Sequence, residues 1–248
     1  STQHQLGYTL GLLGQRQRAT SMLEKAIGVF ENLLPVIDRE QSPLEWARAQ
    51  DSFGNVLGTL GQRQGDTDML QRSVLAFEAA LQERTRDNAP MDWAATQNNL
   101  GTVLQVIAQR EKDPKLLKKS VEAYRNCLQE WTRERVPSNW ATTFNNLGMV
   151  HQALGEHEAA RAAYQRALEI DERAFGGEHP KVAIRLSNIG SLHQDLGEVD
   201  AAREAYQRAL EIRERCLPAG HPSIQLVRRK LESLGRTTDE GRKTTGDG

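Results

Sequence analysis

Aromatic side chains, cysteine and long apolar stretches are all scarce in this chain of 248 residues. Aromatic residues make up 5% of the sequence and hydrophobic residues 38%, which is little for one deep globular core but more than a disordered chain has. The two cysteines, Cys127 and Cys216, form no CxxC pair, so neither a disulfide framework nor a zinc ribbon is indicated. No segment approaches the 18 or so apolar residues that span a bilayer. We therefore expect a folded cytoplasmic protein with a thin core, reduced thiols and no membrane partner.

Excess charge and catalytic motifs are lacking too. The chain has 32 basic and 33 acidic residues, so no net field attracts nucleic acid or an anionic membrane. The sequence contains no GxSxG, HExxH or GxGxxG motif and no phosphate-binding Gly-Lys-Ser/Thr. Its six histidines include no pair at the i, i+4 spacing of helical metal ligands. We predict a protein that is not an enzyme and has no cofactor, no metal site and no nucleic-acid partner.

Glycines at a regular spacing divide the chain into five repeats. The aligned glycines, at spacings of 47, 47, 47 and 42 residues, are Gly7, Gly54, Gly101, Gly148 and Gly190. An aromatic residue follows each glycine after 23 residues in three repeats and after 16 in the last two, namely Phe30, Phe77, Tyr124, Tyr164 and Tyr206. We interpret the seven missing residues as a shorter turn inside the repeat. Their loss alone would reduce the glycine spacing from 47 to 40 residues, so the observed 42 implies two added residues, which we interpret as a longer connection to the next repeat.

Each repeat is predicted to form two helices, its first helix and its second helix. In the fourth repeat an apolar stripe at i, i+3, i+4 and i+7 is formed by Phe144, Leu147, Gly148 and His151. Gly155 then breaks the first helix, and the stripe of the second helix begins at Ala160. Glycine inside a helix costs about 1 kcal/mol relative to alanine, so the aligned glycines need an offset. We expect that offset to be a close contact with the second helix, where small residues recur at Ala26, Ser73, Ser120, Ala160 and Ala202.

Helix starts carry their own signals. Residues Ser42 to Glu45 read as a capping box with proline at the first helical position. Asp113, His179 and His221 each precede a proline and are expected to cap the helix that follows. His151 and His193 occupy an aromatic position of the first helix and are expected to be core residues, and Cys127 is expected to be a buried small residue.

The pattern Trp-x2-Leu-Gly-x2-Tyr followed by Ala-x3-Phe is that of the tetratricopeptide repeat, and the fourth and fifth repeats resemble it. The matching residues are Phe144, Leu147, Gly148, His151, Ala160 and Tyr164, then Leu186, Ile189, Gly190, His193, Ala202 and Tyr206. The segment Gly-Gly-Glu-His-Pro from Gly176 to Pro180 looks like the kinesin-light-chain type of this repeat found in bacterial proteins. The resemblance implies an all-α, right-handed superhelical solenoid of five repeats with a C-terminal capping helix.

The expected domain organisation follows from this alignment. The repeats are predicted to span about 1–41, 42–88, 89–136, 137–178 and 179–220, inside a solenoid of residues 1–235. Residues 222–234 are expected to form the capping helix, with a polar outer face. Residues 236–248 hold no large apolar side chain and are predicted to be a disordered tail.

In tetratricopeptide repeats the concave groove is lined by a face of the first helices about 130° from their buried stripe, and the resemblance implies a peptide-binding groove here. The candidate groove residues are Arg48, Asp51, Asn55, Asn98, Asn99, Thr102, Gln105, Thr142, Asn145, Asn146, Met149, Gln152, Ser187, Asn188, Ser191 and Gln194. Uncharged amides and hydroxyls dominate, and they suit the backbone of an extended peptide better than a charged terminus. The alternative is that the asparagines bond to neighbouring helices and only fix the stacking of repeats.

These observations favour a non-enzymatic scaffold or adaptor that binds an extended or helical segment of a protein partner. A second interpretation is that the repeats form the sensor or regulatory arm of a larger enzyme, because bacterial chains of this repeat type are often fused to effector domains. A third is self-association through exposed ends of the repeat array.

Overall fold

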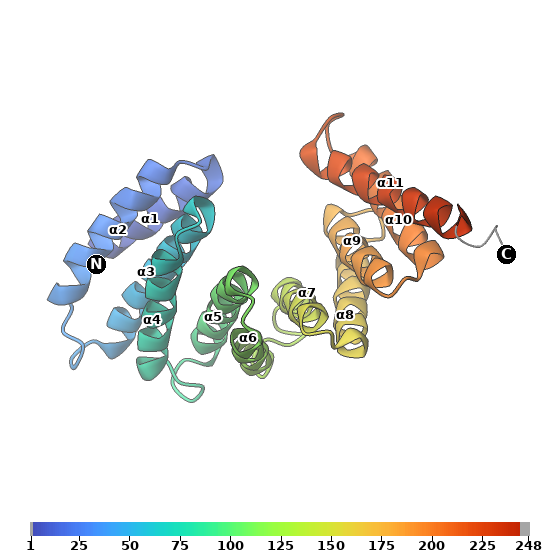
Figure 1. Ribbon diagram of the computed structural model, residues 1–248. Helices are drawn as coiled ribbons and strands as arrows, with labels where there is room; N and C mark the ends of the chain where they lie inside the picture. The colour runs from blue at the N-terminus through green and yellow to red at the C-terminus, as the bar shows by residue number, and fades with distance from the viewer. Residues whose placement is uncertain (1, 244–248) are drawn as a thin grey trace. The chain divides into compact units, whose positions relative to one another are not determined.

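The computed structural model describes residues 2–243 and the side chains of residues 2–234, and this part of the chain is helical without a strand (Figure 1). Its helices are α1 (Thr2–Gln17), α2 (Thr20–Leu33), α3 (Pro43–Gln64), α4 (Thr67–Glu83), α5 (Pro90–Glu111), α6 (Pro114–Cys127), α7 (Pro137–Ala153), α8 (His157–Phe175), α9 (Pro180–Asp195), α10 (Val199–Cys216) and α11 (Pro222–Lys243), with a short 3₁₀ turn η1 (Leu34–Val36). The first ten helices pack as five consecutive pairs, and α11 packs against α10. The predicted all-α fold of five helical repeats and a capping helix is confirmed.

The chain divides into two compact units, an N-terminal unit (Ser1–Trp131, with α1 to α6) and a C-terminal unit (Thr132–Gly248, with α7 to α11). Within each unit the second helix of one repeat packs against the first helix of the next. Leu23 and Phe30 of α2 share a core with Leu57 of α3, and Leu168 of α8 shares one with Leu186 of α9. Within each unit the core is therefore a thin layer that continues from one repeat to the next, as the low aromatic content indicates.

The aligned glycines lie against the aligned aromatic rings. A Cβ atom on Gly54 would lie 2.8 Å from the Phe77 ring, and one on Gly148 would lie 2.6 Å from the Tyr164 ring. The small residue of the second helix is also close, because Ser73 Oγ donates a hydrogen bond to the Gly54 carbonyl oxygen at 2.6 Å. The predicted close contact is present, and its tightest part is the ring rather than the small side chain.

The longer repeats of the N-terminal unit have longer helices, not the larger turn that we expected. Gly54 lies ten residues before the last residue of α3, whereas Gly148 lies only five before the last residue of α7. Likewise α4 begins ten residues before Phe77, and α8 begins seven before Tyr164. Seven residues are about two turns of α-helix, so the insertion adds roughly one turn to each helix and leaves the buried faces in register.

The expected longer connection between the late repeats is also absent. Helix α8 continues eleven residues beyond Tyr164, whereas α4 continues six beyond Phe77, and the segment after α8 is the shorter one, four residues against six. The two added residues therefore extend the second helix. An unbroken helix satisfies each added backbone group internally, which a longer loop does not.

Helix caps agree with the sequence at three sites and differ at one. Asp113 Oδ1 accepts from the backbone N–H of Lys115 at 2.7 Å, and the Nδ1 atoms of His179 and His221 each accept from the backbone N–H two residues on, at 3.2 Å. Ser42 precedes α3 as predicted, but its side chain makes no capping bond. Its backbone, at φ −137° and ψ 56°, is outside the extended geometry that directs an N-cap oxygen at the helix.

In the late repeats a histidine and a glutamate close the turn between the two helices. His151 Nδ1 lies 2.5 Å from Glu156 Oε2, and His193 is paired in the same way with Glu198. His151 is buried, as predicted for its position. The hydrogen bond from His193 and the nearby Arg161 lower the pKa of the exposed Glu198 carboxyl.

The C-terminal helix continues past its predicted end. Helix α11 runs to Lys243, beyond residue 234 where we expected the capping helix to stop. Residues 236–243 of the expected tail are therefore helical, whereas residues 244–248 lie outside the described residues and their disorder stays a prediction. Among the described residues, no helix has both the length and the apolar character that crossing a bilayer requires.

Candidate functional site

The candidate groove residues lie on the first helices of four repeats, where the structure places them in two sets. The set in the N-terminal unit, called here the N-terminal groove face, is Arg48, Asp51 and Asn55 on α3 and Asn98, Asn99, Thr102 and Gln105 on α5. The set in the C-terminal unit, the C-terminal groove face, is Thr142, Asn145, Asn146, Met149 and Gln152 on α7 and Ser187, Asn188, Ser191 and Gln194 on α9. In each unit, side-chain hydrogen bonds join the two helices of the set.

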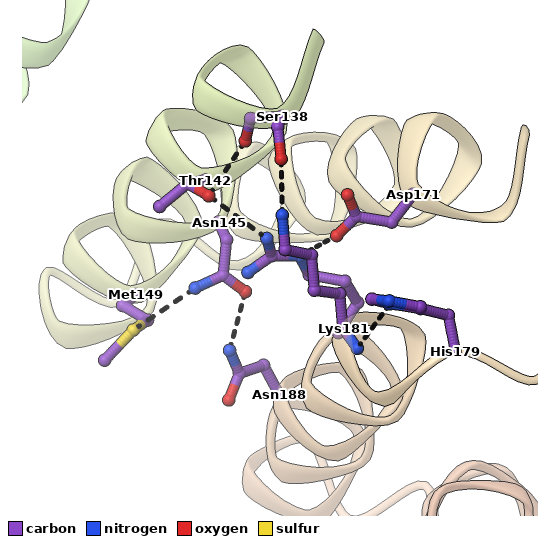
Figure 2. Close-up of polar contacts among 9 residues, drawn as sticks. Ser138, Thr142, Asn145, Met149, Asp171, His179, Lys181 and Asn188 are labelled. Atoms are coloured by element: carbon purple, nitrogen blue, oxygen red, sulfur yellow. Dashed lines mark hydrogen bonds and ion pairs between the residues drawn. The ribbon is translucent and has the colours of Figure 1, made fainter. Parts of the chain in front are cut away.

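Asparagine amides on the C-terminal groove face are paired with each other (Figure 2). Asn188 Nδ2 on α9 donates to Asn145 Oδ1 on α7 at 2.7 Å, and Asn145 Nδ2 points to the Met149 sulfur at 3.7 Å. Asn145 is buried, whereas Asn146 is half-buried and makes no hydrogen bond within the described part of the chain. The bond between Asn188 and Asn145 favours the stacking role for these two residues, which the sequence left open.

Glutamines on both faces are held by tyrosine hydroxyls. Tyr164 donates to Gln152 Oε1 at 2.8 Å, and Gln152 Nε2 donates onward to Asp195 of the next repeat at 2.6 Å. Burial, with the Asp195 carboxylate as a smaller cause, raises the pKa of Tyr164. The same tyrosine-to-glutamine bond recurs in two other repeats, between Tyr124 and Gln105 at 3.1 Å and between Tyr206 and Gln194 at 3.0 Å. These glutamines are fixed in place before any ligand arrives.

The candidate hydroxyls mostly bond to their own helix. Thr102 donates to the Asn98 carbonyl oxygen, Thr142 to that of Ser138 and Ser187 to that of Ala183, at 2.7 to 2.9 Å. Ser187 is buried and also accepts from Arg213 at 3.1 Å, whereas Ser191 is half-buried on α9. A hydroxyl that donates within its helix still has two lone pairs. The Tyr124 hydroxyl lies 3.1 Å from Thr102 Oγ1, and a guanidinium nitrogen lies 3.4 Å from Thr142 Oγ1, so one lone pair of each threonine remains available to a ligand.

Asp51 is a half-buried carboxylate of the N-terminal groove face, with 17% of its side chain exposed. Burial raises the pKa of its carboxyl, and the Arg84 guanidinium, 3.7 Å away, opposes that shift. Asn99 Nδ2 and Asn55 Nδ2 both lie 3.4 Å from its oxygens, so an amide of the next repeat holds it in place. Arg48 is exposed and borders a separate cavity of about 500 Å³ with Arg84 and two carboxylates. Asp51 is therefore already compensated, and Arg48 is not aimed at the amides.

Two cations on α9 were missed by the sequence interpretation, which found only Arg48. Lys181 Nζ is bonded to Ser138 Oγ (Figure 2), and Arg185 Nε donates to Asp171 Oδ2 at 2.8 Å. Arg185 also reaches Thr142 Oγ1 at 3.4 Å. Both side chains project from positions of the helix that we did not count as groove positions, and only the packing of α8 and α7 around α9 turns them toward this face.

Exposed apolar side chains also lie on the groove faces, and one of them, Met149, is among the predicted groove residues. Ile184 of α9 and Met149 of α7 are 45% and 36% exposed, each one helical turn from a paired asparagine. Tyr8 and Leu12 of α1 are 50% and 39% exposed and extend the N-terminal groove face to the first repeat. Tyr8 and Leu12 were not among the predicted groove residues, because the candidates came only from the second to fifth repeats. In the described part of the chain, no three His, Cys, Asp or Glu side chains gather as metal ligands do.

Comparison with known proteins places this arrangement among helical repeats. Two family models match, both described as tetratricopeptide repeat, one over residues 141–215 and the other over residues 1–38. A search of curated proteins gave no match. The three solved structures described next are only 16 to 18% identical to this chain, so their similarity shows a shared fold and nothing further.

Three solved structures illustrate that fold. BtubC (BKLC) from P. vanneervenii has a TM-score of 0.62 and 18% identity, over 92% of this chain and 85% of that chain. TTC0263, a thermophilic TPR protein of Thermus thermophilus, has a TM-score of 0.57 and 16% identity, over 93% and 98%. MamA 41-end from Desulfovibrio magneticus RS-1 has a TM-score of 0.54 and 18% identity, over 88% and 99%.

Proposed function

Since the chain belongs to the tetratricopeptide-repeat proteins, a family of protein-interaction scaffolds, we propose that it binds an extended segment of a protein partner along its groove faces. The observation that carries the proposal is the pairing of fixed amides with exposed apolar side chains on the C-terminal groove face. Asn145 and Asn188 are held by each other, and Met149 and Ile184 stand open to solvent beside them.

The chemistry of that face suits a peptide backbone. Asn188 Oδ1 and the remaining lone pair of Thr142 accept hydrogen bonds, and the amide groups flanking them are fixed, so little side-chain order is lost on binding. An extended peptide has unpaired N–H groups to donate, whereas a helix has already used most of its own. Apolar side chains of the peptide would cover Met149 and Ile184.

One end of the C-terminal groove face favours an acidic ligand residue. Lys181 and Arg185 lie near the start of α9, and α7 begins beside them at Pro137. Helix N-termini carry partial positive charge, which adds to that of the two side chains. The buried Asp171 neutralises Arg185, so Lys181 and the helix ends are what remains to attract an acidic residue.

The proposal is tested by selecting peptides from a random displayed library against the whole chain and measuring their affinity for two variants. Ile184→Glu places a charge where an apolar ligand side chain would rest, and we expect at least a tenfold loss of affinity. Leu75→Glu is the matched control, because Leu75 is a 64% exposed aliphatic residue on a second helix, α4, and should leave affinity unchanged. Equal losses in both variants, or a loss only in the control, would refute the groove assignment.

A further inference from the structure

The N-terminal groove face contains two cavities at the same position of successive repeats. The first, of about 210 Å³, lies between α1 and α3 and is bordered by Tyr8, Gly11, Leu12, Asp51, Asn55 and Val56. The second, of about 110 Å³, lies between α3 and α5 and is bordered by Asn55, Gly58, Phe77, Asn99, Thr102 and Val103. The two are related residue by residue, since Gly11 and Gly58, like Val56 and Val103, are one repeat of 47 residues apart.

The cavities occur where the tyrosine-to-glutamine bond is missing. In the last three repeats the position of Gly11 and Gly58 carries a glutamine that fills the groove wall and accepts from a tyrosine hydroxyl. In the first two repeats that tyrosine is replaced by Phe30 and Phe77, which have no hydroxyl, and the glutamine by glycine. Both partners of the bond are thus absent together, and the space that they would occupy is open to the groove.

The backbone at the two glycines is tightly packed against the next first helix. A Cβ atom on Gly11 would lie 2.9 Å from Val56, and one on Gly58 would lie 3.0 Å from Val103. The glycines therefore bring successive first helices close together at the cavities. These contacts hold the two helices in place, so the openings are preformed.

Apolar side chains and polar groups share the lining of each cavity. In the first, Tyr8, Leu12 and Val56 lie beside the polar Gln15, Asp51 and Ser52. Leu70, Phe77 and Val103 border the second cavity from inside, and Thr102 and Asn99 border it with polar groups. Asn55 borders both cavities, so it stands between them. A ligand that fills both must pass its backbone across this amide.

We propose that the N-terminal unit binds a polyproline-II segment whose aliphatic side chains at i and i+3 enter the two cavities, an inference that rests on the proposed peptide-binding function. Packed helices lie about 8–10 Å apart, which sets the separation of equivalent points on successive first helices. A polyproline-II chain returns a side chain to the same face every three residues, or about 9.3 Å. A β-strand does so every two residues, or about 6.7 Å, which is too short.

The rim also distinguishes a polyproline-II ligand from a helical one. A helix places side chains about 10.5 Å apart at i and i+7, which matches the spacing. Its backbone groups are already bonded internally, however, and would leave Asn55 and Asn99 without new partners. A polyproline-II chain has no internal hydrogen bonds. Asn55 Nδ2 and one N–H of Asn99 Nδ2 are directed at Asp51, so the peptide carbonyls can accept from the second N–H of Asn99, and peptide N–H groups can donate to Asn55 Oδ1.

The test uses three synthetic ten-residue peptides with blocked ends in a proline and alanine background. One carries two valines three residues apart, one carries them two residues apart, and one carries alanine in their place. We expect the i, i+3 peptide to bind the whole chain at least tenfold more tightly than the other two by calorimetry. Equal affinity for all three peptides would overturn the inference. So would no measurable binding of the i, i+3 peptide at 1 mM, because even a weak peptide contact has a Kd of about 1 mM.

A plugged variant shows whether the cavity is responsible. Gly58→Gln with Phe77→Tyr rebuilds the pair that fills the last three repeats, and we expect it to abolish the preference for i, i+3 spacing. Phe77→Tyr alone leaves the cavity open and should retain the preference. Thr59→Phe, which covers the second cavity from its rim, provides the same test should the double variant fail to melt cooperatively.

The failure of this inference is distinguishable from failure of the proposed function. Peptides selected from the library can bind either groove face, whereas a preference for valines three residues apart arises only from the two cavities. Library peptides that still lose affinity with Ile184→Glu, alongside valine peptides without a spacing preference, would sink the cavity assignment and leave the groove function standing.

Discussion

An aromatic ring explains why glycine is placed in the middle of a first helix. In every repeat the glycine faces the ring of Phe30, Phe77, Tyr124, Tyr164 or Tyr206, and a Cβ atom there would lie 2.6 to 2.9 Å from it. Real Cβ atoms do not approach rings so closely, so the ring could not occupy that site beside any other residue. The conformational cost of glycine in the helix is offset by the burial of the ring.

Gly148→Ala should therefore destabilise the protein even though alanine is the better helix former. The added methyl group would overlap the Tyr164 ring, at a cost of about 1 to 3 kcal/mol from overpacking, against a propensity gain of about 1 kcal/mol. Gly28→Ala is the control, because Gly28 lies inside α2 with nothing within 4 Å of its Cβ position. Urea unfolding should show a lower midpoint for the first variant and an equal or higher one for the second. A stabilised Gly148→Ala protein would contradict the ring contact.

At the scale of the element, the helices of successive repeats are tied by polar side chains as well as by the apolar layer. Arg39 of the first repeat bonds to Glu83 of the second, and Arg86 bonds to Glu130 one repeat later, both on exposed surfaces. On the groove side, the half-buried Asn188 bonds to the buried Asn145. Exposed ion pairs contribute little, so the amide bond is the stronger constraint on how α9 lies against α7.

Asn188→Ala and Asn146→Ala should show which of these two asparagines stabilises the stacking of repeats. Loss of the 2.7 Å bond to Asn145 should lower the free energy of unfolding by about 0.5 to 1.5 kcal/mol in Asn188→Ala. Asn146 has no hydrogen bond in the described residues, so Asn146→Ala should leave stability unchanged or slightly higher. Thermal and urea unfolding give both values. Equal stability in the two variants would show that the amide bond does not hold the helices.

At the scale of the whole molecule, the sequence predicted the number of helix pairs but not the lengths of their helices. The register of glycines and aromatics predicted five helix pairs because both residue types are required by one contact. It did not place the seven-residue insertion, since a length difference of two helical turns preserves the hydrophobic period and looks the same in a turn or in a helix.

Contacts between repeats were the part that the sequence could not supply. The pairing of Asn188 with Asn145 and the approach of Arg185 to Thr142 join residues 43 positions apart, and both depend on how far one repeat is rotated on the next. That rotation follows from the packing of whole helices, not from any local pattern. Leu6 and Leu13 of α1 are 52% and 37% exposed, and self-association through this end of the chain stays a prediction.

The most direct test of the account is to locate a bound peptide by photo-crosslinking. A benzoylphenylalanine placed at Met149 lies on the C-terminal groove face, and one placed at Leu75 lies on an exposed second helix. With a library-selected peptide whose affinity falls in Ile184→Glu, used at saturating concentration, we expect efficient crosslinking from position 149 and none above background from position 75. Crosslinking from position 75 with none from position 149 would contradict binding on the groove face.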